Sequence, residues 1–454
     1  MQYVSTRGSS PALNFEDTML TGLAPDGGLY MPESIPVLGT APDAASYEAL
    51  AFDIMRPFIG ETFTDDEFRA IIARAYTGFG QPARAPLKQI APGHWMMELF
   101  HGPTLAFKDF AMQLIGQMFQ TVLDRRGTRV TIVGATSGDT GSAAIEAFKG
   151  LANVDVCILY PHGRVSEVQR RQMTTPPEGN VHAIAVDGTF DDCQRHLKDM
   201  FADHDFRDGV GLAAVNSINW ARVLAQVVYY WWAGASLGGQ RLSFTVPTGN
   251  FGDIYAGFIA KRMGLEIDRL VVATNQNDIL HRALSTGAYK VGTVQPSISP
   301  SMDIQVSSNF ERLLFDAMGR DGAAVADLMG ELGHAGGFQI PGNARAYLEQ
   351  HFASGRASEA ETSARIKTTF DQTGELVCPH TAVGLEVAPH HATPMVTLAT
   401  AHPAKFPDAV EAATGLRPPL PKRMADLYDR SERVARVDND ARAIKDLIKD
   451  RIAR

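Results

Sequence analysis

The chain has 454 residues, of which 45% are hydrophobic and 20% are charged. This composition is typical of a globular protein and excludes a disordered, a collagenous and a coiled-coil protein. At about 150 residues per domain, the length predicts two or three domains. The 42 lysines and arginines against 51 aspartates and glutamates give a formal net charge of −9. This acidic balance argues against a nucleic-acid-binding protein, which needs a basic surface.

The cysteines and the hydrophobic segments indicate the cellular compartment of the protein. Cys157, Cys193 and Cys378 are far apart and form no CxxC pair, so we expect a reducing compartment and no disulfide framework or zinc site. The 13 histidines show no metal-binding spacing such as HExxH. The N-terminus lacks the apolar core of a signal peptide, and the most apolar helical segment, 223–235, is too short to cross a bilayer. We therefore expect a cytoplasmic protein without a metal or a membrane anchor.

The predicted elements begin with a mixed N-terminal part. Gly/Pro-rich loops such as 22–36 alternate there with helical segments such as 45–59, and the run 78–88 is typical of a linker. After the linker, short apolar strands alternate with helical patterns. The strands are predicted at 129–134, 154–160, 181–186, 242–246, 270–273 and 395–399, and the helices at 140–149, from about 166, 189–203, 218–233 and 253–263. Residues 319–373 show helical patterns and few motifs, so we expect a helical addition there.

This alternation predicts an α/β fold with mostly parallel sheets that are covered by helices on both faces. Right-handed crossovers should link the strands. Ligands bind to such sheets at the carboxyl ends of the strands, where loops lead into helix N-termini. Three segments of the chain are candidates for that position.

The first segment, HGPTLAFKDF, places a lysine in apolar surroundings. Lys108 follows Leu105, Ala106 and Phe107 at the start of a helical pattern. Burial and the positive end of a helix both favour the neutral amine and lower its pKa, and a neutral amine is what Schiff-base chemistry requires. The alternative reading of these residues is a surface lysine paired with Asp109.

The second segment, GATSGDTG at 134–141, follows a predicted strand and opens a helix. Its hydroxyl and backbone N–H groups are suited to receive a carboxylate or a phosphate. It matches neither a Walker A loop, nor GxGxxG, nor a GxSxG elbow. The alternative is an ordinary tight turn capped by Asp139 or Thr140.

The third segment, PTGNFGD at 247–253, lies between a predicted strand and a predicted helix. Gly249 and Gly252 allow the backbone to curl so that several N–H groups converge on a phosphate. Asp253 opposes this, because a carboxylate repels a phosphate, and its alternative role is the N-cap of the following helix.

Further polar residues lie at strand–helix junctions. Asn219 and Arg222 are three residues apart at the start of a predicted helix and therefore share a face. Taken singly, such residues more often cap helices or form turns than bind ligands. The others at such junctions are Arg164, Ser166, Asn216, Ser217 and Thr400.

Together, these segments resemble the threonine synthase family, pyridoxal-phosphate enzymes of the tryptophan-synthase-β fold group. The matching pieces occur in the family's order: HGPTLAFKDF, TSGDTGSAA, NSINWAR, PTGNFGD, SPSMDIQVSSNFERL, CPHTAVG and TAHPAKF. The N-terminal FEDTMLTGLAPDGGLYMPE also resembles the family's opening segment, so the resemblance covers nearly the whole chain.

The resemblance implies an α/β fold of PLP fold type II, with two parallel-sheet-containing domains and an N-terminal domain. We expect the N-terminal domain at 1–90 and the small α/β domain at 126–229. The large cofactor-binding domain, with helical additions, is expected at 91–125 and 230–454.

The resemblance also implies roles for single residues. Lys108 would hold pyridoxal 5'-phosphate as a Schiff base and act as the catalytic base, Asp139 would lie near the cofactor's phenolic oxygen, and Thr400 would face its pyridine nitrogen. The phosphate loop would be formed by Gly249, Asn250, Phe251, Gly252 and Asp253. The substrate carboxylate would be received by Thr136, Ser137, Gly138 and Thr140. Candidates for the substrate phosphate are Arg164, Ser166, Asn219 and Arg222.

The implied reaction is the conversion of O-phospho-L-homoserine and water to L-threonine and phosphate, in the last step of threonine biosynthesis. We expect a small-molecule substrate, no nucleic-acid or membrane partner, and a monomer or homodimer. The alternatives are a threonine synthase-like phospho-lyase and a serine/threonine dehydratase. A further alternative is a non-catalytic anion-binding protein of the same fold. The presence of Lys108 argues against this alternative.

Overall fold

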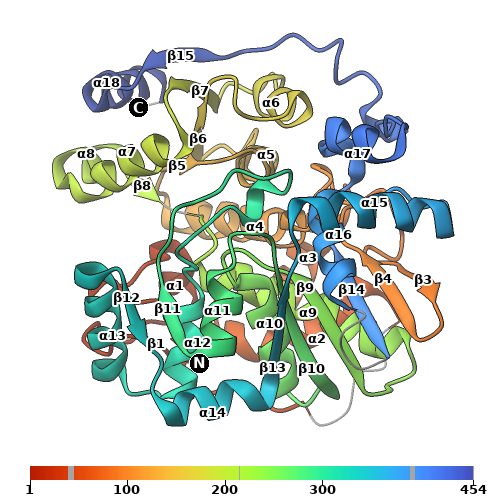
Figure 1. Ribbon diagram of the computed structural model, residues 1–454. Coiled ribbons are helices and arrows are strands. Elements are labelled where there is room, and N and C mark those ends of the chain that lie inside the picture. Colours follow the sequence, from red (N-terminus) through yellow and green to blue (C-terminus); the bar gives the residue numbers. More distant parts are fainter. Residues whose placement is uncertain (39–44, 214, 389–393, 453–454) are drawn as a thin grey trace.

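The computed structural model describes residues 1–38, 45–213, 215–388 and 394–452. Figure 1 shows two sheet-containing parts, one above the other, with the long helix α4 (Lys108–Arg126) between them. α4 packs against α5 (Asp139–Phe148) of the upper part and against α9 (Trp220–Ser236) of the lower part. The first residue of α4 therefore lies where the two parts meet.

The upper part is built on a five-stranded sheet, all of whose strands are parallel, in the order β15-β7-β6-β5-β8. Alternate residues of its strands face opposite layers. Ile158 packs in the cluster that contains α5, whereas Leu159 packs with α7, α8 and α18. The strands are β5 (Val130–Ala135), β6 (Val154–Pro161), β7 (Val181–Asp187), β8 (Leu212–Ala213) and β15 (Ala435–Asp438). The helices, besides α5, are α6 (Glu167–Thr174), α7 (Phe190–Ala202), α8 (His204–Val210) and α18 (Ala441–Arg451).

The lower part is built on a six-stranded sheet in the order β13-β10-β9-β14-β4-β3. Its strands are parallel except for the antiparallel pair β3 and β4. Along β10, Val271 packs with α16 on one face and Leu270 packs with α10 on the other. The strands are β3 (Leu87–Ala91), β4 (His94–Glu98), β9 (Leu242–Pro247), β10 (Ile267–Thr274), β13 (Phe352–Arg356) and β14 (Met395–Ala399). The covering helices include α10 (Gly252–Arg262) and α16 (Pro379–Val387).

The N-terminal part packs on the lower sheet's helices rather than on a sheet. Its helices α2 (Tyr47–Ile59) and α3 (Asp65–Tyr76) bury one apolar stripe each, α2 against α9 and α3 against α4. The stripe of α2 includes Tyr47, whose ring lies edge-on to Tyr76 and Trp232. The remaining N-terminal elements are β1 (Tyr3–Ser5), α1 (Phe15–Thr21) and β2 (Tyr30–Pro32).

The structure differs from the sequence-based expectation in several segments. Strands β3 and β4 were not predicted, and α9, which begins inside the range 126–229 expected for the small domain, packs with α10 of the lower part. Residues 319–373 are not purely helical, because they contain β12 (Gly337–Gln339) and the edge strand β13 of the lower sheet. The C-terminal end of the range 230–454 does not lie with the large domain, because β15 pairs with β7 of the upper sheet. The chain thus returns to the upper part at its end, as Figure 1 shows in blue.

The other elements connect these layers. None of the helices in the described ranges is both long and apolar enough to cross a membrane. The connecting helices are α11 (Ile279–Thr286), α12 (Phe310–Ala317), α13 (Gly322–Ala335), α14 (Gly342–His351), α15 (Glu359–Thr373) and α17 (Pro407–Thr414). Short pieces are the strand β11 (Ala288–Lys290) and the 3₁₀ helices η1 (Pro300–Met302), η3 (Pro403–Lys405) and η4 (Lys422–Met424).

Candidate active site

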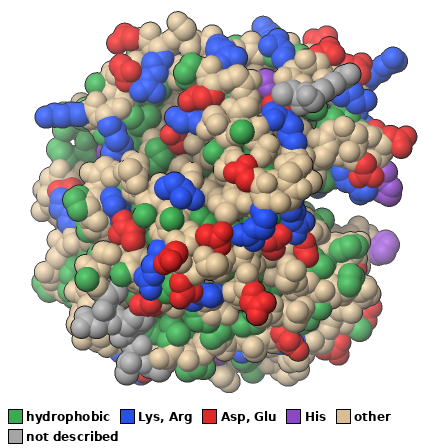
Figure 2. Space-filling view, turned by 180° about the vertical axis from the view of Figure 1, so that it is seen from behind, with side chains coloured by type: hydrophobic (Ala, Val, Ile, Leu, Met, Phe, Trp, Pro, Cys, Tyr) green, Lys and Arg blue, Asp and Glu red, His purple; other side chains and the backbone are tan. Residues whose placement is uncertain are grey.

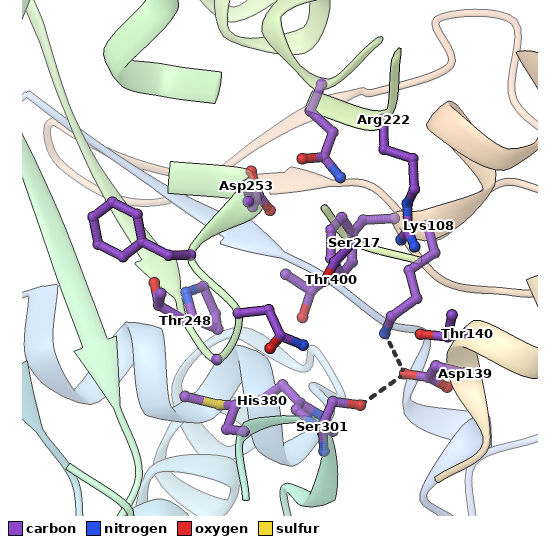
Figure 3. Close-up of a pocket in the computed structure, with 18 residues that line it drawn as sticks. Lys108, Asp139, Thr140, Ser217, Arg222, Thr248, Asp253, Ser301, His380 and Thr400 are labelled. Carbon is purple, nitrogen blue, oxygen red and sulfur yellow. Dashed lines mark hydrogen bonds and ion pairs between the residues drawn. The ribbon is translucent and has the colours of Figure 1, made fainter. Parts of the chain in front are cut away.

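A cavity lies where the N-termini of α4, α5 and α10 meet the carboxyl ends of β9 and β14 (Figure 3). This is the position at which parallel α/β sheets bind ligands. The cavity brings together residues of all three segments that the sequence singled out. Its lining consists of Phe107, Lys108, Asp139, Thr140, Ser217, Arg222, Gln226, Pro247, Thr248, Gly249, Asn250, Phe251, Gly252, Asp253, Ser301, Met302, His380 and Thr400.

Lys108 is the first residue of α4, and its side chain is 10% exposed. Its Nζ lies 3.2 Å from Oδ2 of Asp139 (Figure 3). Burial lowers the pKa of this amine, Asp139 partly opposes that effect, and the positive charges of Lys405 and Arg222 lower the pKa further. The alternative of a surface lysine paired with Asp109 does not hold. Asp109 is buried and instead accepts hydrogen bonds from the N–H and hydroxyl of Thr104.

Asp139 is the electrostatic centre of the cavity. Its Oδ2 accepts hydrogen bonds from Lys108 and from the hydroxyl of Ser301, both at 3.2 Å. Its Oδ1 lies 2.9 Å from Nζ of Lys405 and 2.9 Å from Nε2 of Gln169. Burial alone would raise the pKa of this carboxyl, but the two lysines and the hydrogen bonds hold it well below its usual range. Asp139 is therefore ionised, and it does not cap α5, whose N-cap is Gly138 without a side-chain bond.

The loop from Pro247 to α10 turns its N–H groups toward the cavity. The carbonyl of Gly249 accepts a hydrogen bond from the hydroxyl of Ser307, and the carbonyl of Asn250 accepts bonds from the N–H and amide of Asn309. Because the peptide unit is planar and trans, the N–H groups that follow these carbonyls point the opposite way. They join the uncapped first turn of α10, which is an anion-binding arrangement.

Asp253 does not cap α10, so that alternative is wrong. The N-cap is Phe251, which has a φ of 65° and lacks a side-chain cap bond. Asp253 instead accepts hydrogen bonds from the hydroxyls of Tyr229 and Tyr230 on its Oδ1, at 2.5 and 2.9 Å. Burial raises the pKa of Asp253 to about 6, although the two tyrosine bonds oppose the shift. A phosphate held nearby would favour the protonated form of this carboxyl further, because the neutral form does not repel it.

Arg222 is a buried guanidinium in the same cavity (Figure 3). Its Nη1 donates to the carbonyl of Val215 at 3.2 Å, its Nε has no hydrogen-bond partner, and no described carboxylate pairs with it. Burial lowers its pKa to about 10, which leaves it charged at neutral pH. A buried cation without a counter-ion is costly, so the site is suited to an anionic ligand.

Six predicted substrate residues do not line the cavity. The Thr136 hydroxyl accepts from the N–H groups of Gly138 and Gly141 and so shapes the turn. A Cβ at Gly138 would overlap the Gln169 side chain, so this glycine serves the close packing of the turn. Ser137 lies in the same turn, outside the lining.

The other three of these residues belong to different structures. Ser166 caps α6 in a capping box. Arg164 is exposed in the loop before it. Asn219 is fully buried, caps α9 and donates to the carbonyl of Met19, so its side chain serves the fold. The spacing of Asn219 and Arg222 therefore reflects a cap and a first-turn side chain rather than a shared binding face.

Sequence reasoning did not single out several cavity residues. His380 and Ser301 lie in segments that resemble the family, but their residue types alone carried no chemical signal. His380 accepts a hydrogen bond from the N–H of Ser301 on Nε2, its Nδ1 has no partner, and burial lowers its pKa to about 4. It is therefore a neutral imidazole whose proton is on Nδ1. Sequence reasoning also missed Lys405, whose Nζ contacts Oδ1 of Asp139.

Comparison with known proteins decides the family. Residues 2–76 match the model for the threonine synthase N terminus, 84–331 that for pyridoxal-phosphate-dependent enzymes, and 381–448 that for the threonine synthase C-terminal region. A threonine synthase from Pseudomonas aeruginosa is 52% identical to the chain, over 97% of the chain and 96% of the relative. The chain belongs to the threonine synthase family.

Other members of the threonine synthase family agree with this assignment. A crystal structure of a PLP-bound threonine synthase from Brucella melitensis matches with a TM-score of 0.97 and 51% identity, over 99% of each chain. A human protein called threonine synthase-like 2 is 37% identical over 99% of the chain and 97% of its own length. As a member of this family, the chain is a pyridoxal-phosphate-dependent lyase with the parallel-sheet α/β fold that its sequence predicted.

The residues present fit the family's cofactor. Lys108 offers a buried amine of lowered pKa for its aldehyde, and the loop before α10 offers inward N–H groups for its phosphate. Four buried polar atoms of lining residues lack partners among the described residues, which is typical of a site that a polar ligand completes. They are Arg222 Nε, Gln226 Oε1, Asp253 Oδ2 and His380 Nδ1.

Proposed function

We propose that this chain converts O-phospho-L-homoserine and water to L-threonine and phosphate, the last step of threonine biosynthesis. The observation that carries this choice of substrate is the unpaired guanidinium of Arg222 in the same cavity as Lys108. The cofactor's phosphate has its own loop at 247–253, so a second anion site suits a substrate that brings a phosphate of its own. Guanidinium groups bind phosphate through charge-assisted hydrogen bonds.

Lys108 carries the proton transfers in this proposal. When bound, pyridoxal phosphate supplies the aldehyde for Lys108 and a ring that delocalises the negative charge developed at the substrate α-carbon. Nζ of Lys108, once the substrate amine has replaced it, removes the α-proton. The resulting ammonium group must first pass this proton on, for which the bound cofactor would offer an acceptor, before the amine takes a β-proton. The amine later returns protons to the substrate, because one flexible side chain beside the reacting carbons reaches each of them.

The surrounding residues orient the substrate. Thr140 and the uncapped first turn of α5 are placed to bind its carboxylate. Arg222 binds the phosphate and stabilises the charge that grows as it leaves from the γ-carbon. Asp139 lies beside the Lys108 nitrogen, and Thr400, directly after β14, is assigned to the pyridine nitrogen.

Water must reach the β-carbon only after phosphate has left. Asp139 and Thr140 come from the upper part, whereas Lys108, Ser301 and Thr400 belong to α4 or the lower part. The substrate therefore lies between two bodies that can close over it, and closure excludes water until the addition step.

Product analysis tests this function. The holoenzyme supplied with O-phospho-L-homoserine should release phosphate and L-threonine in equal amounts, measured by a phosphate assay and amino-acid chromatography. Equal amounts of phosphate and a 2-oxo acid, without threonine, would instead identify a phospho-lyase. Formation of a 2-oxo acid from L-serine or L-threonine, with no turnover of the phosphorylated substrate, would identify a dehydratase.

A further inference from the structure

The site contains a second buried lysine to which the proposed reaction gives no task. Lys405 is the last residue of η3, which follows shortly after Thr400 in the chain. Its side chain is 0% exposed. Its Nζ lies 2.9 Å from Oδ1 of Asp139 and donates to the carbonyl of Thr104, also at 2.9 Å. The hydroxyl of Ser142 lies 3.4 Å away. Three oxygen atoms therefore surround this ammonium group, as a buried lysine charge requires.

The carboxylate of Asp139 thus contacts two lysines, one on each of its oxygens. Lys405 contacts Oδ1 of Asp139 at 2.9 Å, whereas Lys108 contacts Oδ2 at 3.2 Å and shares that oxygen with Ser301. A buried site holds paired charges far better than a surplus charge. Lys405 has the shorter contact and more acceptors, whereas burial lowers the pKa of Lys108.

We propose that Lys405 is a positioning residue that neutralises Asp139 and thereby leaves the Lys108 amine free to lose its proton. The inference rests on the proposed role of Lys108 as the cofactor lysine, and it gives Lys405 a role in that chemistry. A neutral amine is the form that attacks an aldehyde and removes a proton. Without Lys405, the carboxylate of Asp139 would have Lys108 as its only lysine partner and would hold it as an ammonium ion.

The other charged groups around Lys108 do not replace Lys405. Arg222 on α9 also favours the neutral amine, but it makes no contact with Asp139. His380 on α16 is neutral, since burial lowers its pKa to about 4. Asp253 on α10 and Asp109 on α4 are carboxyls whose pKa burial raises to about 6 in each case. Asp109 is held by Thr104 and Asp253 by two tyrosines, so Asp139 is the carboxylate in contact with Lys108.

The test measures the proton affinity of the Lys108 amine directly. The full-length apoprotein is labelled with acetic anhydride across a pH series, and mass spectrometry of the peptide that contains Lys108 gives the midpoint of its reactivity. Lys405→Met should raise this midpoint by about one pH unit or more, which at a fixed lower pH means about tenfold less labelling. Lys405→Arg keeps the charge and should restore most of the wild-type midpoint. The pH midpoint of the holoenzyme's visible absorption should move in the same direction as the labelling.

An unchanged Lys108 midpoint in folded Lys405→Met protein would overturn the proposal. If the single variant fails to fold, the double variant Asp139→Asn/Lys405→Met removes both charges of the pair together. Its midpoint should stay within about one pH unit of the wild-type value, because the pair carries no net charge, and a midpoint more than about one unit lower would overturn the proposal by showing that Asp139 acts on Lys108 as a carboxylate that Lys405 does not neutralise. Since labelling needs neither substrate nor cofactor, its outcome is separate from whether the holoenzyme forms threonine.

Discussion

Asp139 and Asp253 show how strongly the neighbours of a single residue decide its charge. Both carboxyls are buried in the same cavity. Two lysines contact Asp139 and hold its pKa well below the usual range, although burial opposes them. Asp253 has only hydroxyl partners in contact, so burial dominates and raises its pKa to about 6. Asp139 is therefore a carboxylate that pairs with cations, whereas Asp253 takes up a proton more readily than an ordinary aspartate does.

The raised pKa of Asp253 predicts a pH-dependent stability. Because the folded pKa is about 6 and the unfolded value is near 3.8, the folded state favours the protonated form. The wild-type apoprotein should therefore lose stability relative to Asp253→Asn as pH rises from about 4 to about 6, by about 3 kcal/mol in total. Urea unfolding at several pH values measures the difference. Parallel curves for the two proteins would contradict the pKa assignment, and the exposed change Asp446→Asn provides the control.

Arg222 should act on substrate more than on cofactor. Arg222→Ala removes the buried guanidinium and should raise KM for O-phospho-L-homoserine by about 10- to 100-fold, corresponding to about 1.4–2.7 kcal/mol. The affinity of the apoprotein for pyridoxal phosphate, measured by absorbance titration, should change far less. An unchanged KM would remove Arg222 from the substrate site.

At the scale of elements, three helices meet the cavity without a side-chain cap. α4, α5 and α10 begin after Phe107, Gly138 and Phe251, and none of these residues makes a side-chain cap bond. By contrast, α6 and α7 of the upper part begin with capping boxes. In α10 the first-turn N–H groups have no hydrogen-bond partner among the described residues and are free to bind an external anion, whereas in α5 the N–H of Gly141 donates to the Thr136 hydroxyl and in α4 the N–H groups of Asp109 and Phe110 donate to backbone carbonyls. The N-terminus of α10 is therefore the helix end that offers the most free N–H groups to an anion.

The loop before α10 can be tested with two glycine substitutions. A Cβ at Gly249 would lie 2.8 Å from the carbonyl oxygen of Ser301, which is backbone and cannot easily move away. Gly249→Ala should therefore displace the loop and weaken pyridoxal-phosphate binding by about tenfold or more. Gly252→Ala is the milder comparison, because its Cβ would lie 3.3 Å from the Asn309 amide, a contact that a shift of a few tenths of an ångström relieves. Equal cofactor affinities of the two variants would contradict the proposed loop geometry.

Sequence patterns predicted the elements that are locally marked. The apolar strands at 130–135, 154–161 and 242–247 and the loops that follow them were evident, because continuous apolar runs and Gly-rich turns carry local signals. β13 and β15 were missed because FASGR and ARVD are short and partly polar, and only their partners in the sheets make them strands. Lys405 was missed for a similar reason, since its contact with Asp139 depends on tertiary structure.

At the scale of the whole molecule, the C-terminal segment returns to the upper part and completes the core of its sheet. α18 places Ile444 and Ile448 in the core cluster of the upper sheet, and both are fully buried. On the face shown in Figure 2, positive and negative side chains are interspersed. This face therefore shows mixed charge rather than the basic patch of a nucleic-acid surface.

Ile448 offers a test of this attachment. Ile448→Ala leaves a cavity between α18 and the upper sheet and should lower the free energy of unfolding by about 2–4 kcal/mol. Hydrogen exchange should increase in β6 and β7 before it increases in β9 and β10. Asp446→Ala, on the exposed side of the same helix, should change stability by less than about 0.5 kcal/mol. Equal effects of the two substitutions would show that α18 does not stabilise the upper sheet.

Lys108, and not the neighbouring buried Lys405, is the lysine that we propose forms the bond to pyridoxal phosphate. Reduction of the holoenzyme with borohydride, followed by peptide mass mapping, tests this assignment most directly. We predict the phosphopyridoxyl mass on the peptide that contains Lys108, and loss of both label and turnover in Lys108→Ala. A label on Lys405, on another lysine, or on none would contradict the account.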